Sequence, residues 1–235
     1  MAWLGEHEYA HRGLHSGAVV ENSMSAFAEA IGRGMGIECD VQATGDGGAA
    51  VFHDWELDRL TGERGPVAER TIEQLREVAI GEGSDRIASL RDLLGLVRGR
   101  VPLLVEVKSR RERRVAPLCL AVRRELEGYR GEVAVMSFDP RVGSWFRRHA
   151  PGVVRGLVVT EEGARTLSGV WRRHVALWHA KPDFLAYDVR DLPSRFAAAQ
   201  RRRGLPLLTW TVRNAAQRKV ASEHADAAIC EGGGV

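Results

Sequence analysis

The sequence is poor in cysteine and has no long apolar run. Its 235 residues include three cysteines, Cys39, Cys119 and Cys230, which are widely spaced and form no Cys-x-x-Cys pair. An odd, scattered set predicts neither a disulfide framework nor a zinc site, and it suits a reducing compartment. No stretch approaches 18 apolar residues, and the N-terminal segment lacks the basic and apolar parts of a signal peptide. We therefore expect a cytoplasmic protein without stable membrane insertion.

Lysine is also scarce. Lys108, Lys181 and Lys219 are the only lysines among 34 basic residues, and the formal net charge is +3. The arginines occur in short groups such as Arg110 to Arg114 and Arg201 to Arg203, which fall in helix-like segments. This placement favours solvated helix faces over a nucleic-acid-binding stripe, so we expect no nucleic-acid partner. The sequence pI of about 9.0 is compatible with weak attraction to anionic substrates.

The composition, with 44% hydrophobic and 28% charged residues, is that of an ordinary globular protein. No linker rich in Pro, Gly or Ser divides the chain, so a single domain over residues 1–235 is expected. Short apolar runs alternate with helical patterns. The predicted strands span residues 7–11, 36–42, 49–53, 101–107, 132–137, 153–159, 183–187, 206–212 and 226–230. The predicted helices span residues 23–33, 89–98, 111–127, 140–149, 161–178, 194–203 and 214–223.

Eight strand–helix steps result if residues 49–53 form a side excursion. This count favours an α/β fold of the closed (β/α)8 TIM barrel type over an open doubly wound sheet. Residues 57–89 are rich in Gly and turn signals, and they predict a small loop-rich insertion after the second strand, near the barrel mouth. Only "EGGGV" follows the last strand, so the eighth helix is expected to be missing or reduced to a turn.

Carboxylates stand on one face of two predicted strands. In "GIECDVQ", Glu38 and Asp40 share a face because side chains alternate along a strand, and in "VPLLVEVK" Glu106 and Lys108 emerge together at the strand end. Buried charges are costly unless they are paired or bind a metal. Three converging carboxylates suit Mg²⁺ or Ca²⁺. The alternative is that Glu38 or Asp40 pairs with Lys108 or Arg12 and binds no metal.

Two histidines lie at the carboxyl ends of predicted strands, near the predicted carboxylates. His11 ends the first strand, and His53 follows the excursion strand in "VFHD". Two imidazoles on opposite sides of a reacting group can act as general base and general acid. Arg12 and Lys108 add positive charge suited to phosphate oxygens. The other six histidines lie in loop or helix patterns and are interpreted as structural or surface groups.

These residues together resemble the glycerophosphodiester phosphodiesterase family. The matching motifs follow the family's order over nearly the whole chain: His11-Arg12-Gly13, Glu21-Asn22, Glu38-Cys39-Asp40, Asp46-Gly47, His53-Asp54 and Glu106-Val107-Lys108. The segments "LDRLTG", "SFDP" and "WTV" are also similar to the family. Family members usually have a Thr-Asp-Pro-like motif after the last strand, where this chain has Cys230-Glu231-Gly232.

The resemblance implies a TIM barrel that hydrolyses small glycerophosphodiesters to glycerol 3-phosphate and an alcohol. By position, Glu38, Asp40 and Glu106 would hold one divalent cation, Mg²⁺ or Ca²⁺, and His11 and His53 would be the catalytic acid/base pair. Family precedent implies attack by the substrate's own glycerol hydroxyl, giving a cyclic phosphate that water then opens. Arg12 and Lys108 would bind phosphate, and Glu21 and Asn22 would support the first loop. Trp210 would line the glycerol or headgroup pocket, or it would pack in the core.

Two other functions remain open at this point. One is a phospholipase-D-like enzyme that acts on lysophospholipids and releases a cyclic product. The other is a catalytically silent barrel that binds phosphorylated metabolites, which would work without His11 and His53.

Overall fold

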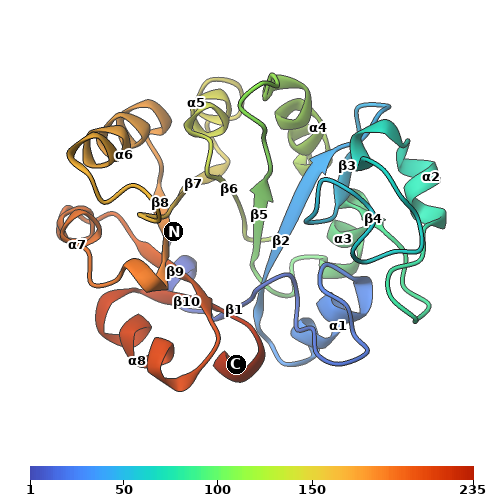
Figure 1. The fold of residues 1–235 in the computed structure, drawn as a ribbon, viewed down its shortest axis with the longest axis horizontal. Coiled ribbons are helices and arrows are strands. Elements are labelled where there is room, and N and C mark those ends of the chain that lie inside the picture. The colour runs from blue at the N-terminus through green and yellow to red at the C-terminus, as the bar shows by residue number, and fades with distance from the viewer.

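Eight parallel strands form a closed ring at the centre of the molecule (Figure 1), in a computed structural model that describes residues 1–235. The ring closes because β1 pairs with both β2 and β10. Its strands are β1 (Tyr9–Ala10), β2 (Gly36–Ala43), β5 (Leu103–Val107), β6 (Val133–Ser137), β7 (Val154–Val159), β8 (Phe184–Asp188), β9 (Leu207–Val212) and β10 (Ala227–Cys230). The TIM barrel prediction is therefore confirmed.

Helices surround this ring (Figure 1). They are α1 (Met24–Gly32), α3 (Leu90–Val97), α4 (Ala116–Leu126), α5 (Pro140–His149), α6 (Leu167–Ala180), α7 (Arg195–Arg202) and α8 (Ala215–His224). Side-chain oxygens cap several of them, as expected from their N-terminal residues. Ser23 accepts a hydrogen bond from the Ala26 amide, and Asp139 accepts one from the Arg141 amide ahead of α5. Because Ser23 caps α1, the neighbouring Asn22 is left free for another contact.

The barrel has separate inner and outer apolar layers. The outer layer packs alternate strand residues, Cys39 among them, against the helices. The inner layer fills the amino-terminal end of the barrel with side chains such as Tyr9, Leu104 and Phe184, and with Leu4 from the short 3₁₀ turn η1 (Ala2–Gly5). Apolar filling at one end leaves the carboxyl ends of the strands as the place for polar side chains, where TIM barrels build their sites.

The segment between β2 and α3 leaves the ring. It contains β3 (Ala49–Val51), β4 (Ala88–Ser89), the turn η2 (Val67–Glu69) and α2 (Ile72–Glu77), on the right of Figure 1. β3 pairs antiparallel with β2 and with β4. The segment has an apolar cluster of its own around Phe52, Leu57 and Leu75. The predicted excursion and insertion are confirmed, and the only element after β10 is the 3₁₀ turn η4 (Gly232–Gly234).

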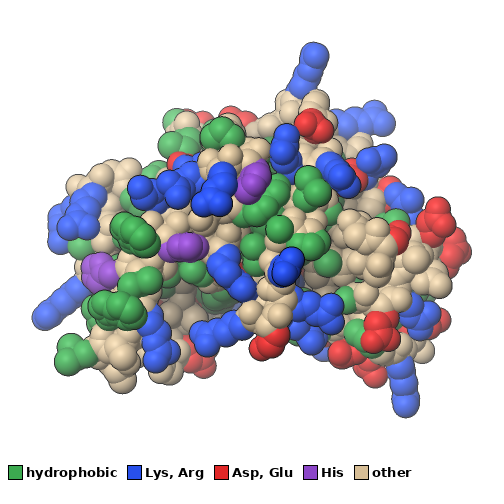
Figure 2. All heavy atoms as spheres, turned by 90° about the horizontal axis from the view of Figure 1, so that it is seen from above, with side chains coloured by type: hydrophobic (Ala, Val, Ile, Leu, Met, Phe, Trp, Pro, Cys, Tyr) green, Lys and Arg blue, Asp and Glu red, His purple; other side chains and the backbone are tan.

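The structure corrects the placement of one arginine group. The arginine group from Arg110 to Arg114 was expected in a helix-like segment, with a helix over 111–127. The observed helix α4 begins only at Ala116, and these arginines form the loop that follows β5. Two observations explain the later start: Arg113 closes a turn by donating its amide to the Arg110 carbonyl, and Pro117 occupies the first turn of α4. Arg201 and Arg202 do lie in α7, as expected. Basic side chains are prominent on the face seen in Figure 2, and no helix is long and apolar enough to cross a bilayer.

Gly36 and Gly156 make room for the rings of Tyr9 and Phe184 inside the barrel, which leads to a stability prediction. A Cβ atom at Gly156 would lie 2.3 Å from the Phe184 ring, so we expect Gly156→Ala to lower the free energy of unfolding by about 1–3 kcal/mol. Chemical denaturation would measure it. Gly152→Ala is the control, because its Cβ would meet nothing within 4 Å. Equal stability of the two variants would contradict the packing argument.

Candidate active site

A cavity of about 130 Å³ opens at the carboxyl ends of the barrel strands. The structure brings eight of the ten predicted site residues to its wall. The other two lie behind it: Glu21 accepts a hydrogen bond from Arg12, and Asn22 donates one to Asp40. The wall residues are His11, Arg12, Glu38, Asp40, His53, Glu106, Lys108, Met136, Phe138, Val158, Trp210 and Ile229. The charged members come from β2, β5 and the segments that follow β1, β3 and β5.

Three carboxylates meet in this cavity. Glu38, Asp40 and Glu106 each offer an oxygen, and these oxygens lie within 4.8 Å of one another. Asp40 and Glu106 are register partners on neighbouring parallel strands, and Glu38 lies two residues before Asp40 on the same face. The side-chain parity expected from the sequence is therefore correct. Burial and the charge of Asp40 raise the pKa of Glu38 well above its usual value, and they raise the pKa of Glu106 to about 7.

Asp40 is the carboxylate with the most partners. It is 2% exposed, and it accepts hydrogen bonds from the Asn22 side-chain amide at 3.0 Å and from Lys108 Nζ at 3.3 Å. Arg12 Nε lies 3.1 Å from Asp40 Oδ2. Burial acts to raise the pKa of Asp40, but Lys108 and Arg12 outweigh it and lower that pKa. Asp40 is therefore the stable anion of the three.

The loop after β1 has an unusual backbone. Arg12 and Asn22 both have a φ of 56°, in the left-handed region, and the Asn22 amide donates to the Arg12 carbonyl. This turn aims the Arg12 amide at Glu38 Oε2, at 3.0 Å, and the Arg12 side chain at Glu21 and Asp40. Gly13 follows with a φ of 77°, where a Cβ would collide with Ala26. The His-Arg-Gly motif thus builds a contact surface for β2.

His11 is held by a carboxylate from the opposite end of the chain. Its Nδ1 lies 2.5 Å from Glu231 Oε2, and its Nε2 lies 4.0 Å from Glu38 Oε2. Burial lowers the pKa of His11, although the hydrogen bond to Glu231 acts to raise it. Glu231 also lies near His15 and forms an ion pair with Arg213. His15, interpreted from sequence as a structural group, therefore contacts the partner of His11.

His53 is held in the same way. Its Nδ1 lies 2.7 Å from Asp54 Oδ1, and Arg59 in turn contacts both Asp54 and Glu21. Burial lowers the pKa of His53, and the hydrogen bond from Arg59 lowers the pKa of Asp54 to about 2. A charge network therefore runs from Asp54 through Arg59 and Glu21 to Arg12.

Sequence reasoning missed Glu231, Arg59 and Gln42 as site residues, and it did not assign Asp54 as the partner of His53. Gln42 donates to the carbonyls of Phe52 and Asp54, which holds the turn that carries His53. A signal was available for Gln42, which shares a strand face with Glu38 and Asp40. The position of Glu231 directly after the last barrel strand was the corresponding signal for that residue.

An aromatic wall lines the other side of the cavity. Trp210 Nε1 donates to the Ala186 carbonyl at 2.9 Å, which fixes the indole, and Phe138 packs edge-on against it at 5.4 Å between ring centroids. Trp210 therefore does line the cavity, and Phe138, which is 47% exposed, extends the wall to the mouth.

The model of the glycerophosphoryl diester phosphodiesterase family matches residues 11–231. The chain belongs to this family. Its members are phosphoric diester hydrolases, and the matched range begins at His11 and ends at Glu231.

The relatives include YhdW of Bacillus subtilis, which is 28% identical over 218 residues, covering 87% of this chain and 85% of that protein. A glycerophosphodiester phosphodiesterase of Caldanaerobacter subterraneus is 38% identical over 108 residues, but these span only 43% of this chain and 44% of that relative. A solved phosphodiesterase of Oleispira antarctica, in complex with the product sn-glycerol-3-phosphate, has a TM-score of 0.82 at 20% identity and covers 95% of this chain and 92% of that one. This last likeness concerns the fold.

The two histidine–carboxylate pairs lead to a titration prediction. Because Glu231 acts to raise the pKa of His11, we expect Glu231→Gln to lower that pKa further, so that His11 stays neutral to a lower pH. Histidine NMR signals followed against pH would measure this. Asp54→Asn is the matched control, because it should lower the pKa of His53 and leave His11 unchanged. An unchanged His11 titration in Glu231→Gln would contradict the proposed contact.

Proposed function

We propose that this protein hydrolyses glycerophosphodiesters to glycerol 3-phosphate and an alcohol, with one divalent cation and a His11–His53 acid/base pair. The observation that carries the proposal is the single small cavity shared by two histidines and three carboxylates. Each imidazole has its Nδ1 next to a carboxylate, and both line that cavity. The family match supports the substrate class.

The residues present fit a hard divalent cation. The donor set consists of carboxylate oxygens, which Mg²⁺ and Ca²⁺ prefer. Arg12 and Lys108 both compensate the charge of Asp40. Glu38 accepts one hydrogen bond, from the Arg12 amide, and Glu106 has Lys108 Nζ at 3.7 Å. Glu38, Asp40 and Glu106 would hold the ion, which when bound would acidify a substrate hydroxyl and neutralise phosphate charge.

The two histidines would transfer the protons. With Nδ1 engaged by Glu231 or Asp54, the Nε2 atom of each ring is the one left for substrate. One imidazole removes the proton of the glycerol hydroxyl that attacks phosphorus, and the other protonates the departing alcohol oxygen. Water then opens the cyclic phosphate, so that one water is consumed for each diester cleaved. Burial lowers the pKa of both imidazoles, which suits the one that acts as the base and is neutral near pH 7.

The remaining residues bind and orient. Arg12 and Lys108 stand beside the carboxylates, where they can also contact phosphate oxygens. Glu21 and Asn22 position Arg12 and Asp40, and Trp210 with Phe138 offers an apolar wall to the glycerol carbons.

The three cysteines are buried and unpaired, which supports a cytoplasmic location.

Activity assays test the acid/base pair. With Mg²⁺ or Ca²⁺, we expect the wild type to release glycerol 3-phosphate from glycerophosphoglycerol, and His11→Ala or His53→Ala to reduce kcat by about 10²–10⁴-fold. His179→Ala, on α6, is the control and should keep full activity. Wild-type protein that is inactive on glycerophosphodiesters but forms a cyclic product from a lysophospholipid would instead support the phospholipase-D-like alternative.

Metal binding gives a second test. Because the pKa of Glu106 is about 7, protons compete with the ion below that pH, and we expect metal affinity measured by calorimetry to rise as the pH increases through 7. Glu106→Gln resembles the protonated side chain, so the fold should persist while affinity falls more than about tenfold.

The surface variant Glu29→Gln serves as the control and should bind the ion normally. Unchanged affinity in Glu106→Gln would contradict the assigned ligand set.

A further inference from the structure

The loop between β5 and α4 concentrates positive charge beside the catalytic cavity. Residues 110–114 read Arg-Arg-Glu-Arg-Arg, which we call the arginine loop. Arg141 anchors this loop, because its guanidinium donates to the carbonyls of Arg110 and Arg111 and pairs with Asp139. The Arg110 guanidinium lies 4.5 Å from the ring centroid of Trp55, within range of a cation–π contact. The loop is thus attached at two points to neighbouring elements.

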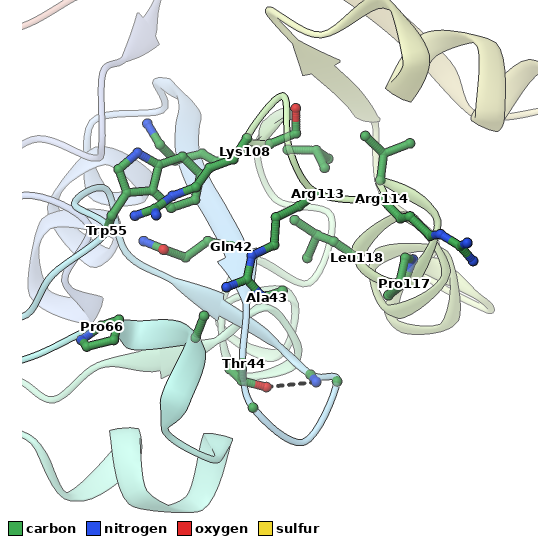
Figure 3. Close-up of a pocket in the computed structure, with 18 of the residues that line it drawn as sticks. Gln42, Ala43, Thr44, Trp55, Pro66, Lys108, Arg113, Arg114, Pro117 and Leu118 are labelled. Atoms are coloured by element: carbon green, nitrogen blue, oxygen red, sulfur yellow. Dashed lines mark hydrogen bonds between the residues drawn. The ribbon is translucent and has the colours of Figure 1, made fainter.

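A second cavity, of about 610 Å³, lies under the arginine loop. Trp55, Arg110 and Arg113 line it together with Gln42 from β2 and Leu118 from α4. Figure 3 shows Arg113 reaching across the cavity toward Gln42 and Ala43, while Trp55 and Lys108 lie side by side at one end. Lys108 lines this cavity and the catalytic cavity, so its side chain borders both spaces.

The size of the catalytic cavity makes this neighbouring space relevant. Its volume of about 130 Å³ is well below the roughly 300–1,000 Å³ that is usual for a pocket enclosing an entire small-molecule ligand. A glycerophosphodiester with its phosphate near Lys108 therefore has to extend its second alcohol out of the catalytic cavity. That same lysine lines the cavity under the arginine loop.

Basic side chains outnumber acidic ones along the wall of this second cavity. Arg110, Arg113 and Arg114 form no ion pair with any carboxylate, unlike the neighbouring Arg141, which pairs with Asp139. Its acidic members, Glu56 and Glu69, are exposed at its rim and also form no ion pair. Excess positive charge around a concave space raises the local concentration of anions.

On the basis of the function proposed above, we propose that the cavity under the arginine loop binds the leaving alcohol and favours alcohols that carry a negative charge. The preferred substrates are thus glycerophosphodiesters whose second alcohol bears a phosphate or carboxylate group. Arg113 contacts that anion, and Trp55 and Leu118 pack against the carbon chain. Neutral alcohols bind the same space without the ionic contact.

Two substrates test this inference, because their leaving alcohols differ in charge. Glycerophosphoglycerol releases neutral glycerol, whereas bis(glycerophospho)glycerol releases an alcohol that carries a phosphodiester. We expect the wild type to prefer the charged substrate in kcat/KM, and Arg113→Gln to reduce this preference by about three- to fivefold, as for one exposed ionic contact. Arg113→Glu should reduce it further, and added salt should reduce it in the wild type.

The control is Arg124→Gln, which removes the same charge from the exposed end of α4 and should leave the preference unchanged. An equal loss of the preference in Arg113→Gln and Arg124→Gln would show that only the net charge of the protein matters, and it would overturn the proposal. A loss in Arg111→Gln alone would also overturn it, because Arg111 lines a different cavity, beside Phe138 and Asp139. Failure of the wild type to hydrolyse either substrate would instead contradict the catalytic function itself.

Discussion

The compensation of one buried carboxylate, Asp40, organises the whole centre of this barrel. A carboxylate at 2% exposure is tolerable only because Asn22, Arg12 and Lys108 all contact it, from the first loop and from the next strand. The same contacts fix the positions of the loop after β1 and the end of β5. Glu38 and Glu106 have fewer partners, and their pKa values are raised because burial and the charge of Asp40 disfavour ionisation. The site therefore holds one stable anion and two carboxylates whose ionisation a cation would favour.

The two histidines are oriented by different means with the same result. Glu231 reaches His11 from the end of β10, whereas Asp54 is the immediate neighbour of His53 and is itself held by Arg59. In both cases the carboxylate contacts Nδ1, so the opposite ring nitrogen, Nε2, is left without that contact. The first and last strands of the barrel must therefore pair correctly before His11 acquires its partner.

The fold and most of the wall residues could be predicted because both rest on local regularities. Alternation along β2 and β5 places Glu38, Asp40 and Glu106 on one face. Eight regularly spaced strands, seven of them followed by a helix, indicate the barrel. The partner Glu231 was not predicted, since its contact spans 220 residues and has no periodic signature. The arginine loop was misplaced in a helix because charged runs are typical of solvated helix faces. Only the Arg113 turn and the contacts of Arg141 reveal its actual path.

The insertion between β2 and α3 bears on how the molecule would lose activity during unfolding. His53 belongs to a segment with its own apolar cluster, joined to the ring through the pairing of β3 with β2 and the Gln42 side chain. Such units can open locally while the rest of a protein stays folded. Partial denaturation would then withdraw one imidazole and leave the carboxylates assembled. Inactivation would precede collapse of the barrel, and the inactive form would still resemble the native molecule in its overall dimensions.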